Sequence, residues 1–389
     1  MSRSSSKPGI GAQIATFTFT RTVLNTGFRM IYPFLPTFAR GLGISLETTA
    51  LAATARSALG FLSPVLGSTA DTRGRKAAMM LGLALFAAGG FVVGLWPRLT
   101  GFLIGVVLIG AGKIIFDPAI HAFLGDRVPY ERRGLAIALA EMGWSGAFWI
   151  GVPLAGWLIA RSTWWLPFPA LGALAVLAGV LLWGILPDDR PAGHTARPSL
   201  REAIHTTMKH PAALAGLAVG MLISVANEVI NIIFGAWLES SFGLAVAALG
   251  AATAVIGVAE LAGEGLVALL ADRLGKRRSV AIGIVLNMAA SLALPLIGRT
   301  TVGALAGLFL LFISFEYALV SSIPLITELV PGARGTLLAA NIAGLSAGRV
   351  AGTLIGPALF ASGLLTNSLT AVVLDGLALA VLLIFVKLK

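Results

Sequence analysis

The sequence contains no cysteine among its 389 residues, and only 12% of the residues are charged. The absence of cysteine excludes a disulfide scaffold, a thiolate metal site and a cysteine nucleophile. Globular proteins carry about 25% charged residues, so the charge content is unusually low. In contrast, 57% of the residues are hydrophobic and 47 are glycine. The high hydrophobic content and the low charge are typical of an integral membrane protein. The many glycines fit this class as well, because small residues let helices approach closely in lipid.

The motifs of common enzyme classes are also missing. The four histidines do not form an H-E-x-x-H motif, and no G-x-S-x-G motif occurs. Gly112 and Lys113 are followed by isoleucine rather than by the serine or threonine of a phosphate-binding loop. We therefore expect no enzymatic activity, no metal site and no bound cofactor.

Hydrophobic stretches of about 20 residues, long enough to cross a bilayer, recur along the chain. They predict an all-α integral membrane protein with twelve transmembrane helices at 14–36, 46–68, 77–96, 100–124, 134–160, 164–186, 212–238, 244–270, 279–298, 302–328, 335–361 and 367–386. The longest connection, 187–211, contains the capping-box pattern Ser199-Leu-Arg-Glu202 and predicts a short helix at the membrane surface. This linker separates an N-terminal six-helix bundle (1–186) from a C-terminal six-helix bundle (212–389).

The net charge of +11 is distributed unevenly. Nineteen of the 28 lysines and arginines lie at the termini and in every second connection. The connections on the opposite side contain only Arg40, Arg98, Arg161 and Arg299. This asymmetry follows the positive-inside rule and predicts that both termini are cytoplasmic. It also explains the basic charge without a nucleic-acid partner, and we expect a monomer in the cell (inner or plasma) membrane that contacts the lipid bilayer.

Short segments recur in the same order in the two halves of the chain. GSTADTRGRKAA at 67–78 corresponds to ALLADRLGKRRS at 268–279, an offset of 201 residues. DRVPYERRG at 126–134 corresponds to ELVPGARG at 328–335. Duplicated six-helix halves with a binding site near the bilayer midplane are an architecture of secondary transporters. The two bundles are therefore expected to be pseudo-symmetric.

The first of these segments resembles the loop motif of the major facilitator superfamily, roughly G-x-x-x-D-x-x-G-R-K/R, and the resemblance extends over essentially the whole chain. The second copy has Ala268 in place of the first glycine. The resemblance implies a gating motif that braces one arrangement of the two halves. The alternative is a positive-inside loop with a turn glycine. The motif residues are Gly67, Asp71, Gly74, Arg75 and Lys76 in the first copy and Asp272, Gly275, Lys276 and Arg277 in the second.

Two features bear on the branch of this superfamily. The fifth span ends with Gly151, Pro153 and Gly156, a partial match to the glycine–proline motif of antiporters. Glycines at every fourth position from Gly344 to Gly356 make a groove on the eleventh span, although helix packing alone explains such a series. Drug–proton antiporters carry an arginine in the fourth span where this chain has Val106, so their standard proton relay does not carry over.

Ionisable residues within the predicted spans cost at least about 2.5 kcal/mol each at mid-membrane on an insertion scale. Lys113, Asp117 and His121 are four residues apart and share one helix face. A self-neutralising Lys113–Asp117 pair is the alternative to a functional role. The ionisable residues within spans are Arg21, Arg29, Arg56, Lys113, Arg349, Asp117, Glu141, Glu228, Glu260, Glu264, Glu316 and Asp375.

The resemblance implies that spans 1, 4, 7 and 10 line a central cavity. Glu260 and Glu264, one turn apart, resist double ionisation, so we expect them to carry the coupling proton, with Glu141 as a neighbour. Arg56 and Arg349 are expected to form ion pairs between the halves, and latching of one conformation is the alternative to proton coupling. The expected substrate-cavity residues are Arg29, Lys113, Asp117, Glu228, Asn231 and Glu316.

Together these features predict a secondary active transporter that moves a small polar, charged or amphiphilic solute by alternating access. The proton gradient is the expected coupling source, and efflux is the expected direction. Proton-coupled uptake, or flipping of a lipid-like molecule by the same fold, is the first alternative. A receptor that binds its ligand without transporting it is a second.

Overall fold

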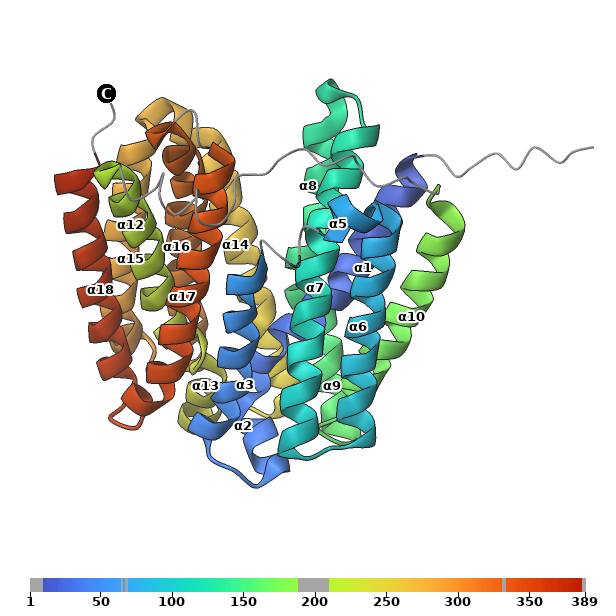
Figure 1. Cartoon of the computed structure of the whole chain (residues 1–389). Coiled ribbons are helices and arrows are strands. Elements are labelled where there is room, and N and C mark those ends of the chain that lie inside the picture. Colours follow the sequence, from blue (N-terminus) through green and yellow to red (C-terminus); the bar gives the residue numbers. More distant parts are fainter. Residues whose placement is uncertain (1–9, 64–65, 67–68, 188–209, 331–333, 387–389) are drawn as a thin grey trace, which may run out of the picture. The chain divides into compact units, whose positions relative to one another are not determined.

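A computed structural model describes residues 10–63, 66, 69–187, 210–330 and 334–386 of the chain. All regular structure within these ranges is helical (Figure 1). The chain forms two compact units, Met1–Met30 with Leu62–Thr195 and Ile31–Phe61 with Ala196–Lys389. The division into two six-helix bundles stays a prediction, and the surface helix expected in the linker lies outside the described residues.

The first unit contains long helices that pack in pairs. α6 lies against both α7 and α10, and α1 lies against α8 (Figure 1). A π-helical turn precedes Pro153, which has no backbone N–H, and the regular hydrogen-bond pattern shifts there. The elements are α1 (Ile10–Arg29), α5 (Thr69–Arg73), α6 (Arg75–Leu95), α7 (Leu99–Arg127), α8 (Tyr130–Gly146), the π turn η2 (Ala147–Gly151), α9 (Val152–Arg161) and α10 (Pro167–Ile185).

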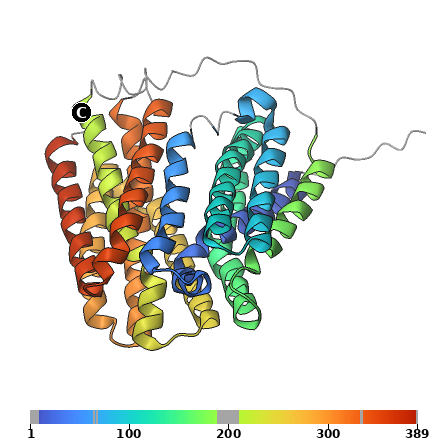
Figure 2. The same ribbon diagram turned by 60° about the horizontal axis from the view of Figure 1, so that its bottom comes forward.

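The second unit combines a segment from early in the chain with all later helices. α3 packs on α17, and α2 packs on α13 and α14. α12 lies beside α17 and α18, as Figure 2 shows from another direction. The elements are α2 (Ile31–Leu42), α3 (Leu46–Ala58), the 3-10 turn η1 (Leu59–Leu62) at the border, α12 (Pro211–Asn231), α13 (Phe234–Phe242), α14 (Val246–Leu274), α15 (Lys276–Ile297), α16 (Thr301–Leu329), α17 (Arg334–Phe360) and α18 (Leu364–Phe385).

The first two expected spans are interrupted. α1 ends at Arg29, and Pro33 lies in the first turn of α2, where its missing N–H costs little. α3 starts afresh after Ser45, whose side chain accepts a hydrogen bond from the Thr48 N–H at 3.1 Å. Ten helices among the described residues are long and apolar enough to cross a membrane, against the twelve expected. α1 has 20 residues but is too polar to count, and α3 has only 13 residues.

The glycine of the repeated loop motif adopts the same backbone conformation in both copies. Gly74 precedes α6 with φ 90°, and Gly275 precedes α15 with φ 84°. Residues with a Cβ rarely adopt such positive φ values, so glycine is needed at both turns. The sequence offset of 201 residues is therefore accompanied by the same glycine turn in both copies, and the pseudo-symmetry of the two halves stays a prediction.

The glycine series of α17 forms the surface on which α12 packs. A Cβ atom at Gly348 would lie 2.6 Å from the Met221 carbonyl oxygen. A Cβ atom at Gly352 would lie 2.5 Å from Glu228 Cβ. The two helices approach this closely only because glycine has no side chain. The packing role expected for this series is confirmed.

Candidate functional site

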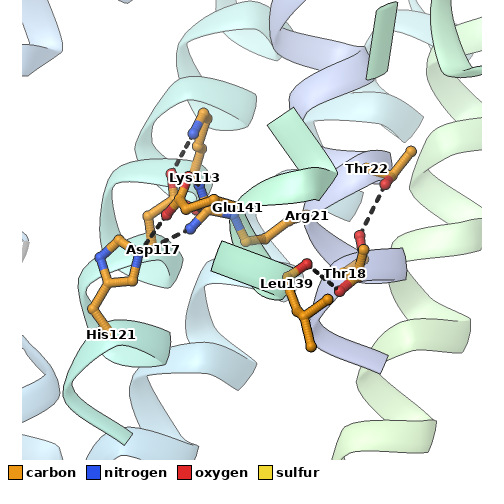
Figure 3. Close-up of polar contacts among 8 residues, drawn as sticks. All are labelled: Thr18, Arg21, Thr22, Lys113, Asp117, His121, Leu139 and Glu141. Carbon is orange, nitrogen blue, oxygen red and sulfur yellow. Dashed lines mark hydrogen bonds and ion pairs between the residues drawn. The ribbon is translucent and has the colours of Figure 1, made fainter. Parts of the chain in front are cut away.

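A charged stripe on α7 forms the first wall of the site. Lys113 and Asp117 form an ion pair one helical turn apart. His121 follows one turn later, and its side chain is much more exposed than that of Lys113. The stripe therefore runs from a buried ammonium group to an accessible imidazole. Figure 3 shows its three side chains.

Arg21 on α1 contributes a second cation to this stripe. Its guanidinium donates from NH2 to Glu141 Oε2 at 2.7 Å, and its NH1 lies 3.1 Å from His121 Nε2 (Figure 3). Its Nε lies 4.0 Å from Asp117 Oδ1. From the sequence, Arg21 is expected to be an intramembrane charge without a site role.

The approach of α1 to α8 brings Arg21 to Glu141. A Cβ atom at Gly143 would lie 2.6 Å from Arg21 Cβ, so only glycine permits this separation. Thr18 fastens the same pair of helices, since its Oγ1 donates to the Leu139 carbonyl oxygen at 2.8 Å (Figure 3). The small residues of the fifth span thus position the charged network.

Glu141 and His121 share a short contact within this network. His121 Nε2 lies 2.6 Å from Glu141 Oε1. Nε2 therefore lies beside both a guanidinium N–H and a carboxylate oxygen. A ring nitrogen carries either a proton or a lone pair, so Nε2 can form a hydrogen bond with only one of these two partners at a time. If Nε2 is protonated, it donates to Glu141, and if it is not, Glu141 makes this bond only as the acid. The protonation of Nε2 therefore decides which of these two neighbours His121 binds through this nitrogen.

Arg29 lies two turns beyond Arg21 on α1 and packs between aromatic rings. Its guanidinium carbon is 4.1 Å from the Trp144 ring centroid and 3.5 Å from the Phe148 ring centroid. Lys113 Nζ lies 5.5 Å from the centroid of the same Trp144 ring. Trp144 thus lies beside both cations that the sequence assigns to the first-half cavity.

Asn25 stands midway between the two arginines of α1. The residue is fully buried, and neither polar atom of its side chain has a hydrogen-bond partner among the described residues. Buried amides almost always have partners in folded proteins. The α1 face that carries Arg21 and Arg29 therefore has unused hydrogen-bonding capacity.

In the second unit, another buried cluster joins residues that the sequence assigns to different roles. Arg56 NH2 donates to the Tyr32 hydroxyl at 2.8 Å. Asn231 Nδ2 donates to Glu228 Oε2 at 3.2 Å. Arg56 and Arg349 both interact electrostatically with Glu228. The two arginines expected to form ion pairs between the halves thus lie in the same unit as the expected cavity residue Glu228, and both interact with its carboxylate. The ion pairs between the halves stay a prediction.

The remaining acids lie on α14 and α16 of the second unit. Glu260 is buried, and Glu264 is half-buried. A Cβ atom at Gly263, between them, would lie 2.8 Å from Glu316 Cβ on α16. Glu316 therefore lies on the face of α16 that packs against the part of α14 carrying both glutamates. Their proton-coupling and cavity roles stay predictions.

The two copies of the loop motif make corresponding contacts. Arg75 pairs with Asp126 at 3.3 Å, and Lys276 pairs with Glu328, so each joins the start of one helix to the end of the next. The next basic residue of each copy binds a carbonyl oxygen: Lys76 binds that of Leu186 at 3.1 Å, and Arg277 binds that of Leu383 at 2.7 Å. Of the other motif residues, Gly67 lies outside the described residues, Asp71 lies in α5 and Asp272 lies in α14. The gating role of the motif stays a prediction.

Comparison with known proteins identifies the family. The family model described as Major Facilitator Superfamily matches residues 17–224. YceJ of Bacillus subtilis (strain 168), an uncharacterized MFS-type transporter, is 26% identical over 342 residues, covering 87% of each chain. Multidrug resistance protein 2 of the same organism is 24% identical over 274 residues, covering 67% of this chain and 66% of the relative. The inward-open structure of the xylose transporter XylE from E. coli has a TM-score of 0.76 at 16% identity, covering 97% of each chain.

The family match spans more than half of the chain and includes all residues of the α1, α7 and α8 network. The helical fold with many apolar helices agrees with the likeness to XylE. The relatives and the fold are those of transporters, not enzymes. The chain therefore belongs to the major facilitator superfamily and is a multi-pass membrane transporter.

Proposed function

We propose that this transporter exports a small polar, charged or amphiphilic solute in exchange for protons, by alternating access in the cell membrane. The proposal includes twelve spans with both termini cytoplasmic, where the broken helices α1–α2 and α3–η1 supply the first two. It also takes the protein to be a monomer. The relative named multidrug resistance protein 2 supports efflux as the direction. The charge asymmetry of the connections supports the orientation.

The observation that carries proton coupling is the contact between Glu141 and His121 at 2.6 Å beside Arg21. Arg21 and Lys113 balance Asp117 and Glu141 when His121 is neutral. An added proton gives the cluster one excess positive charge in a region of low dielectric, and this change has to be compensated. A departing cationic solute, or a shift of the cluster, provides the compensation that couples the two fluxes.

The geometry also supplies a path for this response. When Glu141 is neutral, Asp117 is the remaining carboxylate near Arg21, with its Oδ1 at 4.0 Å from Arg21 Nε. A guanidinium that turns toward Asp117 competes with Lys113 for that carboxylate. Protonation at the exposed end of the stripe would thereby weaken the Lys113–Asp117 pair at its buried end. Arg29, Lys113, Asp117 and the buried amide of Asn25 would contact the solute on this side.

The second unit would contribute Glu228, Asn231 and Glu316 to the solute path. Glu260 and Glu264 are retained as further proton carriers, because two carboxylates one turn apart resist double ionisation. The proposal therefore distinguishes two candidate proton sites, one in each unit. Single substitutions separate them.

The test uses purified protein in proteoliposomes with a pH-sensitive dye inside. Candidate solutes come from a thermal-stabilisation screen, because a ligand that binds the folded state raises its apparent stability. The screen includes a fluoroquinolone, since one relative is named quinolone resistance protein NorA. We expect the strongest stabiliser to drive proton movement in the wild type and in Glu47→Gln, an exposed control. Glu141→Gln should keep solute counterflow but lose proton movement.

The outcomes decide between coupling schemes. If Glu141→Gln and Glu264→Gln both retain wild-type proton movement, the assignment of both proton sites is wrong. If dissipating the pH gradient leaves accumulation unchanged, the protein is a uniporter or flippase rather than an antiporter. Proton movement in the same direction as the solute would establish uptake by symport.

A further inference from the structure

A groove of about 370 Å³ lies between α6 and α10 in the first unit. Met80 and Ala87 belong to its α6 wall, and Ala175, Gly179 and Trp183 belong to its α10 wall. The groove is lined by aliphatic side chains, one methionine, one tryptophan and one glycine. The groove lies outside the charged network and has no role in the transport scheme above.

The groove opens on a surface that faces lipid. Val176, Val180 and Trp183 line it and expose 50%, 66% and 64% of their surface. From Ala175 to Trp183 the helix rises about 12 Å at 1.5 Å per residue. One leaflet of the hydrocarbon core is about 15 Å thick. The groove therefore has the length of a chain segment within a single leaflet.

One end of the groove carries positive charge. Lys76 Nζ lies 4.6 Å from the Trp183 ring centroid and donates to the Leu186 carbonyl oxygen at 3.1 Å. Arg75 begins α6 beside Lys76, and Arg73 ends the preceding helix α5. Tryptophan favours the boundary between hydrocarbon and headgroups. The opposite end of the groove, at Ala87 and Ala175, lies near the middle of both helices along their length.

We propose that this groove binds one acyl chain of an anionic phospholipid, with its phosphate at Lys76 in the leaflet next to the start of α6. Lipid tails are as apolar as the groove itself, so the groove alone does not select one lipid over another. The headgroup makes the selection, because basic residues at the membrane boundary attract anionic lipids. Lys76 itself is largely buried, with 9% of its surface exposed, so the phosphate would meet it at the mouth of the groove. Each Lys or Arg there contributes about a fivefold preference.

The test uses the full-length protein in phosphatidylcholine nanodiscs. These contain a small fraction of phosphatidylglycerol or phosphatidylcholine that carries a photoactivatable diazirine in the middle of the acyl chain. After illumination, peptides from Met80–Ala87 and Ala175–Trp183 are quantified by mass spectrometry. We expect at least about fivefold more labelling of these two segments by the phosphatidylglycerol probe than by the phosphatidylcholine probe.

Variants separate the chain site from the headgroup site. Gly179→Leu should fill the groove and abolish the labelling, since a Cβ there meets only Leu83 Cδ1, at 3.8 Å. Gly184→Leu, on the same helix with open space at its Cβ position, should keep it. Lys76→Gln should reduce the preference for the phosphatidylglycerol probe about fivefold relative to the wild type while leaving chain labelling in place.

Three outcomes would overturn the proposal. Equal labelling of the wild type by both probes would show a lipid shell without headgroup preference. Undiminished labelling in Gly179→Leu would place the chain elsewhere, and so would labelling concentrated on other segments. The comparison of the two probes uses only the wild-type protein, so it still tests the proposal if a variant fails to fold.

Discussion

Replacement of Arg21 by methionine tests whether the α1–α7–α8 network stabilises the folded protein. Methionine keeps a long apolar stem but removes the guanidinium that bonds Glu141 at 2.7 Å. Breaking a fully buried pair costs about 3–5 kcal/mol, whereas an exposed pair contributes about 0–1 kcal/mol. The Arg21 side chain is 4% exposed and that of Glu141 is 39% exposed, so water solvates part of the orphaned carboxylate. We therefore expect a loss of about 2 kcal/mol in the free energy of unfolding.

The assay is titration of purified protein in mild detergent with dodecyl sulfate, followed by tryptophan fluorescence. The double variant Arg21→Met/Glu141→Gln should recover part of the loss, because neither partner then remains charged. We expect a coupling energy of at least about 1 kcal/mol. Arg40 and Glu239 provide a matched control, since they also pair at 2.7 Å but with 58% and 25% exposed side chains. A coupling for Arg21–Glu141 that is no larger than for Arg40–Glu239 would refute the reasoning.

Three further predictions use the same titration, which measures the free energy of unfolding. Gly352→Ala should lower it by about 1–3 kcal/mol, because the added carbon enters the α12–α17 contact. Gly376→Ala is the control and should not destabilise, because its added carbon meets only one methionine carbon, at 3.7 Å. Gly74→Ala should cost about 1–2 kcal/mol because of its positive φ, and Gly265→Ala, with open space and no such backbone, is its control. Asn367→Ala should cost about 1–3 kcal/mol, because two buried backbone carbonyls lose their donor. Equal effects within either glycine pair would contradict the packing and backbone arguments.

The features that local sequence determines were predictable. Hydrophobic runs predicted most of the long helices, and the motif glycines Gly74 and Gly275 predicted two equivalent turns. The pairing of Lys113 with Asp117 follows from their spacing on one helix. The α17 glycine series predicted a helix contact without naming its partner. In each case, neighbouring residues contain enough information to determine the structure.

Features that depend on contacts distant in sequence were not predictable. Arg21 meets Glu141 across 120 residues, and this contact depends on how closely Gly143 lets α1 approach α8. Hydropathy also treated the first expected span as one helix, although α1 and α2 are separate. Arg56 and Glu228 come together because α3 packs within the second unit, and no local pattern indicates that placement.

The placement of Ile31–Phe61 has a topological consequence. A chain cut once within the linker would divide the sequence in two but would not separate the compact units. The backbone passes between them at Met30–Ile31, at Phe61–Leu62 and again between Pro187 and His210. The first crossing coincides with the break between α1 and α2, and the second lies in the 3-10 turn η1. Any movement of one unit against the other must therefore be accommodated at three covalent crossings, two of which already interrupt regular helix.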